Sequence, residues 1–159
     1  MKASHWIIAA AALSFTQPVE AGVNDPELII YRFPGVLDDG GVTGQFFSGI
    51  ATVFNCTNFS GVTETIRFVT RDANGALLQN STMSLDHLQT KAAGTHITNA
   101  YSISLSLATG AVAQGTTAIA ATSINIICTG ITVDAENLKP IFAVSLRGIR
   151  FNPASGSQE

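Results

Sequence analysis

The sequence is short of charge, and this shortage narrows the possible partners. Asp, Glu, Lys and Arg make up only 12% of the 159 residues, and the formal net charge is −3. No two Lys or Arg residues are adjacent, whereas contacts with nucleic-acid phosphates need a basic stripe, so we expect no nucleic-acid partner. The 46% of hydrophobic residues is too high for a disordered chain, which combines low hydrophobicity with high charge.

Motifs for catalysis and metal binding are also missing. No serine lies on a Gly-x-Ser-x-Gly turn, and the histidines beyond the N-terminal stretch, His87 and His96, are too few to complete a metal site without further ligands. Asp38-Asp39-Gly40-Gly41 could offer carboxylates to Ca²⁺, and Asp72 to Gly75 begins like a calcium loop, but the remaining oxygen ligands do not follow, so turns explain both stretches. We therefore predict no enzyme, no metal and no cofactor.

The N-terminus has the pattern of a secretory signal peptide over residues 1–21. Lys2 supplies the positive charge, Trp6 to Phe15 the short apolar run, and Ala21 the small residue before a cleavage site at Gly22. The apolar run is about half the length needed to cross a bilayer, so a membrane anchor is the weaker interpretation, as is a buried N-terminal helix. We expect cleavage, a secreted or periplasmic location and no membrane span afterwards.

The two cysteines lie on the apolar faces of two segments with strand patterns. Because strand side chains alternate between faces, Phe54 shares a face with Cys56, and Ile124 shares one with Cys128 in a segment spanning Thr117–Val133. Two inward thiols on facing sheets can approach closely enough to form a disulfide. That bridge would close a loop of about 70 residues, worth roughly 4 kcal/mol in the chain-entropy model. The alternative is a pair of unpaired buried thiols.

Turn residues separate the other stretches that alternate like strands. We expect a strand at Glu27–Phe33 that ends at Pro34-Gly35, and a strand at Thr63–Arg71 with Ile66 and Phe68 inward. At Asp72–Gly75, the Asn-Gly pair predicts a tight hairpin turn. Further strands are predicted at 76–85, 96–107 and 141–151, whereas 85–95 and 109–115 are predicted to be irregular.

These stretches amount to about seven strands and no helix. Residues 22–151 are therefore predicted to form one antiparallel β-sandwich, immunoglobulin-like or jelly-roll-like, followed by a tail at 152–159. A true immunoglobulin domain packs a Trp against its disulfide, but here the single Trp is Trp6, in the predicted signal peptide. Tyr31 and Tyr101 lie beside apolar neighbours and are expected in or near the core, which argues against sugar stacking.

Several segments resemble a loose, uncharacterised group of small exported bacterial proteins that are predicted β-sandwiches. The similar stretches are ATVFNCTNFSGVTETIRF, the D-x-N-G-x-L hairpin, QGTTAIAATS and the ending IRFNPASGSQE, so that the resemblance runs from about Phe33 to the end. It implies a bacterial envelope or secreted location, where an oxidising periplasm would close a disulfide. It implies no activity, cofactor or functional residue. In bacteria the glycosylation sequons at Asn55, Asn58 and Asn80 would be largely irrelevant.

Three functions remain open on the sequence alone. The first is a non-enzymatic recognition or adhesion-type module that binds an unknown protein or surface partner, with the loops Val36–Gly44 and Thr109–Gly115 as candidate surfaces. The second is a surface-fibre subunit completed by strand exchange, although no donor extension separates the cleavage site from Leu28. The third is a small secreted hydrolase assembled from distant residues around His87 or His96.

Overall fold

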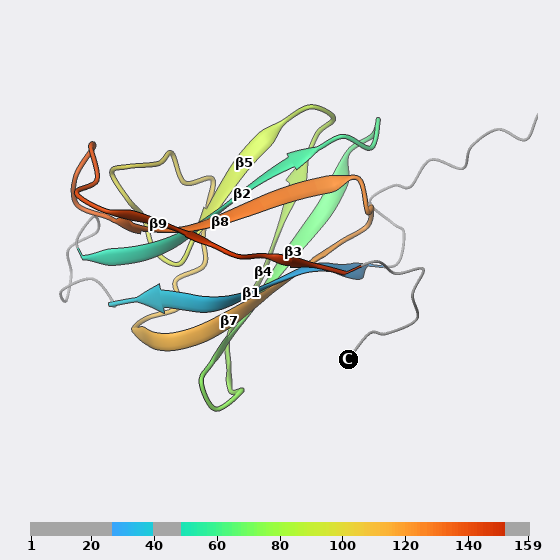
Figure 1. Cartoon of the computed structure of the whole chain (residues 1–159). Helices are drawn as coiled ribbons and strands as arrows, with labels where there is room; N and C mark the ends of the chain where they lie inside the picture. The colour runs from blue at the N-terminus through green and yellow to red at the C-terminus, as the bar shows by residue number, and fades with distance from the viewer. Residues whose placement is uncertain (1–26, 40–48, 152–159) are drawn as a thin grey trace, which may run out of the picture.

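The computed structural model describes residues 27–39 and 49–151 (Figure 1). The predicted signal peptide with its cleavage site at Ala21 and Gly22, Trp6, and the tail at 152–159 lie outside the described residues. The described part contains no helix and consists of two five-stranded sheets. The predicted β-sandwich is thereby confirmed. Within residues 27–39 and 49–151, no helix has the length and apolarity needed to cross a bilayer.

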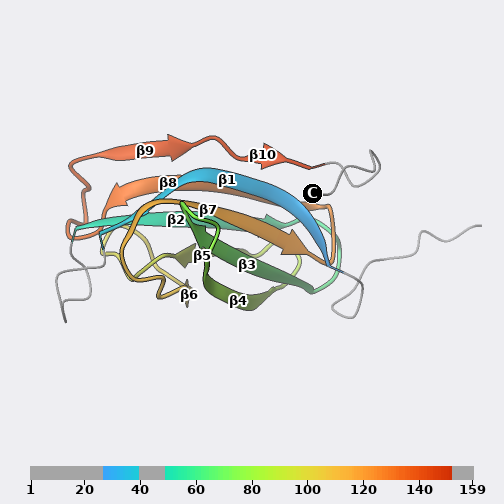
Figure 2. The same ribbon diagram turned by 90° about the horizontal axis from the view of Figure 1, so that it is seen from below.

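Each sheet combines strands from distant parts of the chain (Figure 2). The first sheet has the order β10-β1-β7-β3-β4, with β1 at Leu28–Asp38, β3 at Glu64–Asp72, β4 at Leu77–Leu85, β7 at Val112–Ala121 and β10 at Ile149–Arg150. The second has the order β6-β5-β2-β8-β9, with β2 at Ile50–Asn58, β5 at Thr90–Gly94, β6 at Leu105–Ser106, β8 at Ile126–Asp134 and β9 at Ala143–Leu146. All pairs are antiparallel except β5 with β6.

Aromatic rings from both sheets meet in the core. Phe33 of β1 packs on Phe54 of β2 with 5.2 Å between ring centroids, and Phe54 packs on Phe68 of β3 at 6.0 Å. All three rings are fully buried, as is Ile66, so the predicted inward faces of these strands are confirmed. Burying a side chain of this size contributes roughly 2–3 kcal/mol, so the interlocking rings account for much of the attraction between the sheets.

The hairpin predicted at Asp72–Gly75 is present between β3 and β4. Gly75 has a φ of 83°, which favours glycine, and its N–H donates to the Asp72 carbonyl at 3.1 Å. The Asp72 side chain also accepts the N–H groups of Asn74 and Ala76. The local sequence therefore determines this turn without help from the rest of the fold.

The disulfide Cys56–Cys128 is present, but it does not join the two sheets. The cysteines are direct neighbours on the paired strands β2 and β8, with a Cα–Cα distance of 4.1 Å. The expectation of facing sheets is wrong because Thr117–Val133 is not one strand. The chain turns after Ala121, so that β7 joins the first sheet and β8 the second. Ile124 lies in this turn and is 47% exposed, instead of sharing the core face of Cys128.

Four strand assignments also differ from the prediction. Pro34-Gly35 does not end β1, which continues to Asp38 through shifts in register that accommodate the missing N–H of proline. β5 occupies part of the stretch expected to be irregular, and β7 begins inside the expected loop 109–115. The predicted final strand 141–151 divides into β9 and β10, which belong to different sheets.

The strand predicted at 96–107 is mostly a loop. Tyr101 and Ile103 alternate with polar residues because this loop lies over the outer face of the second sheet, where they pack against Val53, Ala92 and Val133. A small second apolar cluster therefore produces the pattern of a half-buried strand. Tyr101 is partly buried there and Tyr31 is buried in the main core, as expected.

Candidate functional site

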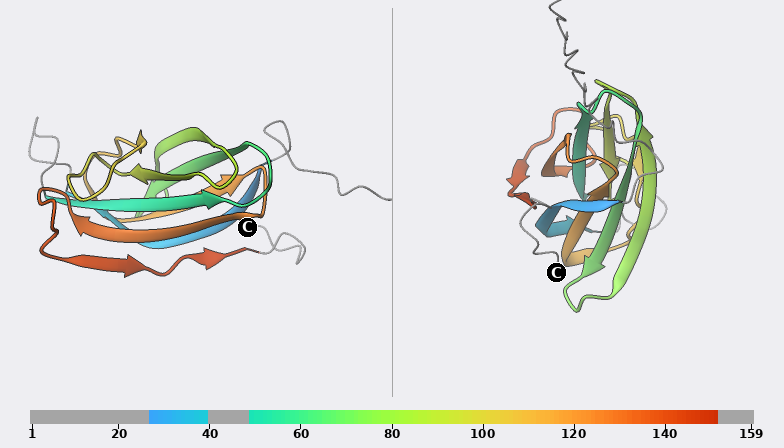
Figure 3. Two further views of the ribbon diagram at one scale, coloured as in Figure 1. Left: turned by 90° about the horizontal axis from the view of Figure 1, so that it is seen from above. Right: turned by 90° about the vertical axis from the view of Figure 1, so that its right-hand side faces the viewer.

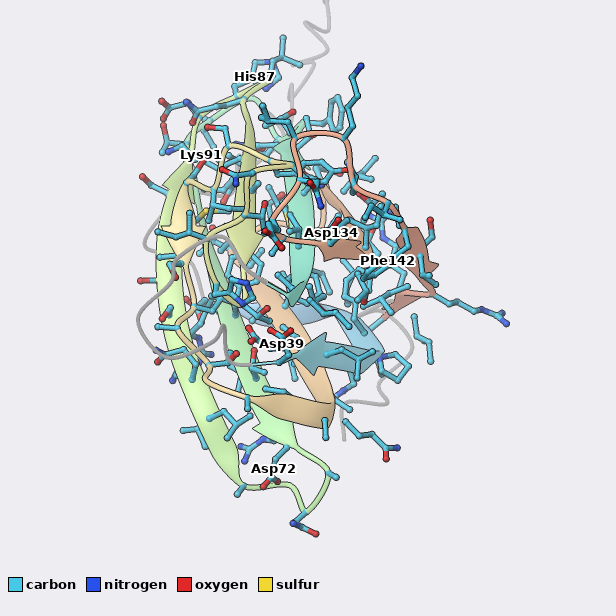
Figure 4. The ribbon with its side chains drawn as sticks, turned by 90° about the vertical axis from the view of Figure 1, so that its left-hand side faces the viewer. Asp39, Asp72, His87, Lys91, Asp134 and Phe142 are labelled. Carbon is cyan, nitrogen blue, oxygen red and sulfur yellow. A yellow bond between two sulfur atoms is a disulfide. The ribbon has the colours of Figure 1, made fainter. Side chains whose placement is uncertain are left out.

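A hollow of about 320 Å³ lies at the end of the sandwich where β1 finishes and β2 and β7 begin. Its walls come from three separate stretches of chain: Leu37, Asp38, Asp39, Ile50, Ala111, Val112 and Ala113. Figure 4 looks toward this end, with Asp39 near the middle of the view. The two loops predicted as partner surfaces thus contribute to one site, although residues 40–44 of the first loop lie outside the described part.

Asp38 is the buried anchor of this end. Its side chain is 1% exposed, and its Oδ2 lies 2.9 Å from Nδ1 of His96, whose side chain is 16% exposed. Thr109 Oγ1 donates to the same carboxylate oxygen at 3.4 Å. Because a buried carboxylate is costly without partners, these contacts hold both ends of the 95–111 stretch against β1. His96 is therefore a mostly buried, hydrogen-bonded side chain.

Asp39 closes the junction between β1 and β2. Its Oδ2 accepts the N–H of Ile50 at 2.9 Å, and its own N–H donates to the Ile50 carbonyl at 3.2 Å. The carboxylate therefore stays beside the apolar wall formed by Ile50 and Ala111. The surface of the hollow is almost wholly apolar, because the Asp38 carboxylate is buried against His96 and Thr109; Asp39 is the exposed acidic residue at its edge.

Asp38, Asp39 and His96 are also the described residues that could hold a metal ion. One ligand atom from each lies within 4.8 Å of the others, which gives an oxygen, oxygen and nitrogen donor set. Zn²⁺ and Mn²⁺ accept such mixed sets. His96 lies 58 positions from Asp38 in the sequence, so spacing along the chain gives no sign of this convergence.

An apolar loop stands beside the hollow. Ala135 N–H donates to the Gly49 carbonyl at 2.8 Å, which places the β8–β9 connection, residues 135–142, at the same end of the sandwich. Leu138 and Ile141 in this loop are 82% and 84% exposed. Figure 4 shows Asp134, which precedes the loop, and Phe142, its last residue, at the same end of the sandwich as Asp39.

Asp134 fixes the shape of that loop. Its carboxylate accepts the side-chain N–H of Asn137 at 2.7 Å, and also the backbone N–H groups of Glu136 and Ile141. These hydrogen bonds, first of all the one from Asn137, hold the pKa of Asp134 below its ordinary value of 3.8, although burial opposes them. The exposed apolar side chains are therefore carried by a connection with a defined conformation.

His87, Asp86 and Glu64 lie at the opposite end of the sheets from the hollow, whereas Asp72 pairs with Gly115 near the start of β7. His87 follows β4, and its Nδ1 accepts the N–H of Gly61 at 3.0 Å, while Asp86 accepts the hydroxyl of Thr63. Both side chains stabilise exposed turns through these hydrogen bonds. His87 and His96 lie at opposite ends of the sandwich. Glu64 begins β3 and is fully buried, with Thr122 donating to its Oε2, so no ligand reaches it from solvent.

The asparagines of the three sequons differ in burial. Asn58 is fully buried, and its side-chain N–H groups donate to the carbonyls of Val62 at 2.7 Å and Leu85 at 2.8 Å. Its role is structural. Asn80 is exposed on β4, and Asn55 is partly buried on β2.

The fold and the bridge between β2 and β8 define a disulfide-bonded all-β sandwich. No family model, curated protein or solved structure matches the chain. The geometry of the site therefore has to support any function by itself.

Proposed function

We infer that this protein is an exported β-sandwich that works by binding a partner, without catalysis, through the end that carries the hollow. We call this surface the recognition end; it comprises residues 37–39, 50, 111–113 and 135–142. The observation that carries the proposal is the hollow itself, whose apolar walls lie beside the exposed Asp39 and an exposed apolar loop. Pockets with mostly apolar walls and a few placed polar groups are typical of ligand sites.

The lining indicates the chemistry of the partner. Leu37, Ile50 and Val112 offer contacts to an apolar group, and the exposed Asp39 favours a positive charge beside it. The partner group would combine the two, as a lysine or arginine next to an apolar residue does in an extended segment. The exposed side chains Leu138 and Ile141 enlarge the apolar part of the surface.

The His96–Asp38 pair supports this role better than hydrolysis. A hydrolytic triad needs a hydroxyl directed at the imidazole. The hydroxyl beside this pair, on Thr109, donates instead toward Asp38 and the Gly110 carbonyl. The pair then serves to fix the wall of the hollow, and His87 lies too far along the sheets to assist.

Two independent observations, the disulfide and the N-terminal sequence pattern, support export. Disulfides persist in oxidising compartments and are rare in the cytosol, and the described chain has both cysteines bonded to each other. Residues 1–21 have the signal-peptide pattern. The resemblance to small exported bacterial proteins agrees with a periplasmic or secreted site of action.

Amide chemical shifts of isotope-labelled protein would test the chemistry of the site. Hexylammonium is the probe, and hexanoate, of equal length and opposite charge, is its control. At ~0.5 kcal/mol per non-hydrogen atom, a ligand of this size binds in the millimolar range. We expect shifts at residues 37–39, 50 and 111–113 with hexylammonium only. Ala113→Phe, which fills the hollow, should abolish them, whereas Ile124→Ser at the other end should not. Equal binding of hexanoate, or an unaltered response of Ala113→Phe, would contradict the proposal.

The fibre-subunit alternative is favoured by a separate observation. The outermost strands β9 and β10, one in each sheet, belong to a single segment whose residues are all exposed or half-buried. Exchange of such a segment between copies would link subunits without any new type of contact.

A further inference from the structure

Residues 143–150 complete both sheets with one short stretch of chain. β9 pairs with β8 from Val133↔Ala143 to Gly130↔Leu146, and β10 pairs with β1 at Tyr31↔Arg150 and Arg32↔Ile149. The views in Figure 3 show β9 and β10 in line along one side of the sandwich. The segment therefore covers the outer edges of β1 and β8 together.

The surface beneath the segment is the apolar core. Phe33 is 1% exposed, and a Cβ at Gly130 or Gly148 would lie only 2.8 or 2.5 Å from its ring carbons, so glycine permits this close approach. Leu146 packs against the same core cluster. Without residues 143–150, the edges of β1 and β8 would lose their partners and the side of Phe33 would be uncovered. Removal of the segment would therefore leave a groove between β1 and β8 that can accept one strand.

The segment is held less firmly than the strands it covers. None of residues 141–150 is buried, and the half-buried members are Leu146 and Gly148. Contacts at its end include the Arg150 guanidinium over the Tyr31 ring at 5.6 Å and its hydrogen bond to the Ile124 carbonyl at 2.6 Å. Exposed edge elements of this kind open at a lower free energy than the core.

The segment and the connection before it expose apolar side chains. Ile141, Val144 and Ile149 are 84%, 58% and 52% exposed. Exposed β-branched side chains on and beside an edge strand are a surface for association. When two copies exchange this segment, their sandwiches approach on this side, and these side chains come to lie between them.

We propose that residues 143–151 of one copy occupy the groove between β1 and β8 of a second copy of this chain, with residues 135–142 as the connection. The incoming segment brings the same Leu146, Gly148 and Arg150, so the contacts in the groove are preserved and protein concentration drives the exchange. Asp134 holds the connection as far as Ile141, so the exchanged part begins beyond that residue. This proposal rests on the strand-exchange alternative above and not on partner binding, although its connection, residues 135–142, also belongs to the recognition end.

An engineered cross-link distinguishes exchange from a closed monomer. Arg32 and Ile149 are opposite each other on β1 and β10 with exposed or half-exposed side chains, so R32C/I149C leaves the core intact. If the segment exchanges, oxidation produces covalent dimers or a ladder on non-reducing gels, and their fraction rises with protein concentration. The native disulfide lies within one chain and adds no link between chains.

The matched control is T57C/T90C, an exposed opposite pair on β2 and β5 that exchange leaves within one chain. It should cross-link only internally. In addition, Gly148→Val, which places side-chain atoms against Phe33, should remove the dimers from the R32C/I149C background. The unmodified chain is examined by sedimentation velocity over a hundredfold concentration range. Solely internal cross-links in R32C/I149C together with a monomer at every concentration would overturn the proposal.

Discussion

Removal of the disulfide tests the energetics of the fold most sharply. In the double variant C56A/C128A, the two strands β2 and β8 lose their covalent link but keep their ladder of hydrogen bonds. The cysteines are separated by 72 positions, for which the chain-entropy model gives about 4 kcal/mol of stabilisation through the unfolded state. A small domain has only 5–15 kcal/mol of net stability, so about a third or more of it would be lost.

Urea unfolding followed by far-ultraviolet circular dichroism measures this loss. With a slope near 2 kcal/mol per molar urea, the midpoint should fall by about 2 M while the folded spectrum stays the same. The control T57A/T90A removes a hydrogen-bonded pair of exposed hydroxyls from the neighbouring ladder β2–β5, and should cost less than about 1 kcal/mol. A midpoint within about 0.5 M of the unaltered protein would refute the claim that the bridge constrains the unfolded chain.

Three further predictions concern single features. The pKa of Asp134 is lower in the folded protein than its ordinary value of 3.8. The carboxylate therefore stabilises the fold fully above pH 3.8, and this stabilisation is lost as the pH falls through the folded pKa. Asp134→Asn should remove this part of the acid dependence, measured by thermal unfolding at a series of pH values. Asn58→Ala leaves two carbonyls without their donor and should cost roughly 2–3 kcal/mol in urea, whereas Asn80→Ala on the exposed edge should cost under about 0.5. The intact mass of the exported protein should begin at Gly22, with thiols that take two labels only after reduction; a full-length mass with two free thiols would count against export.

Features with a local cause follow from the sequence. The Asp72–Gly75 turn, the inward Phe54 and Phe68, and the apolar environment of both cysteines rest on short-range patterns, and the structure confirms each of them. The disulfide pairing also follows, because only two cysteines are present and both alternate with core residues.

Features that depend on which sheet a strand joins do not follow from the sequence. The stretch around Ile124 alternates like a strand, which hides the turn that separates β7 from β8, so the pattern predicts a bridge between the sheets. The loop containing Tyr101 alternates because it covers a second apolar cluster. The approach of His96 to Asp38 is a contact between residues 58 positions apart, which only the assembled sandwich creates.

Site-specific photo-crosslinking from the recognition end tests the proposed function most directly. A photoreactive phenylalanine analogue at position 138, which is 82% exposed and belongs to the recognition end without lining the hollow, leaves the hollow open; the same analogue at position 124 serves as the control on the opposite turn. Irradiation of cells that export the protein should give a discrete adduct from position 138 and none from position 124, and excess hexylammonium should reduce its yield. Identical adducts from both positions, or no adduct from position 138, would contradict binding at this end of the sandwich.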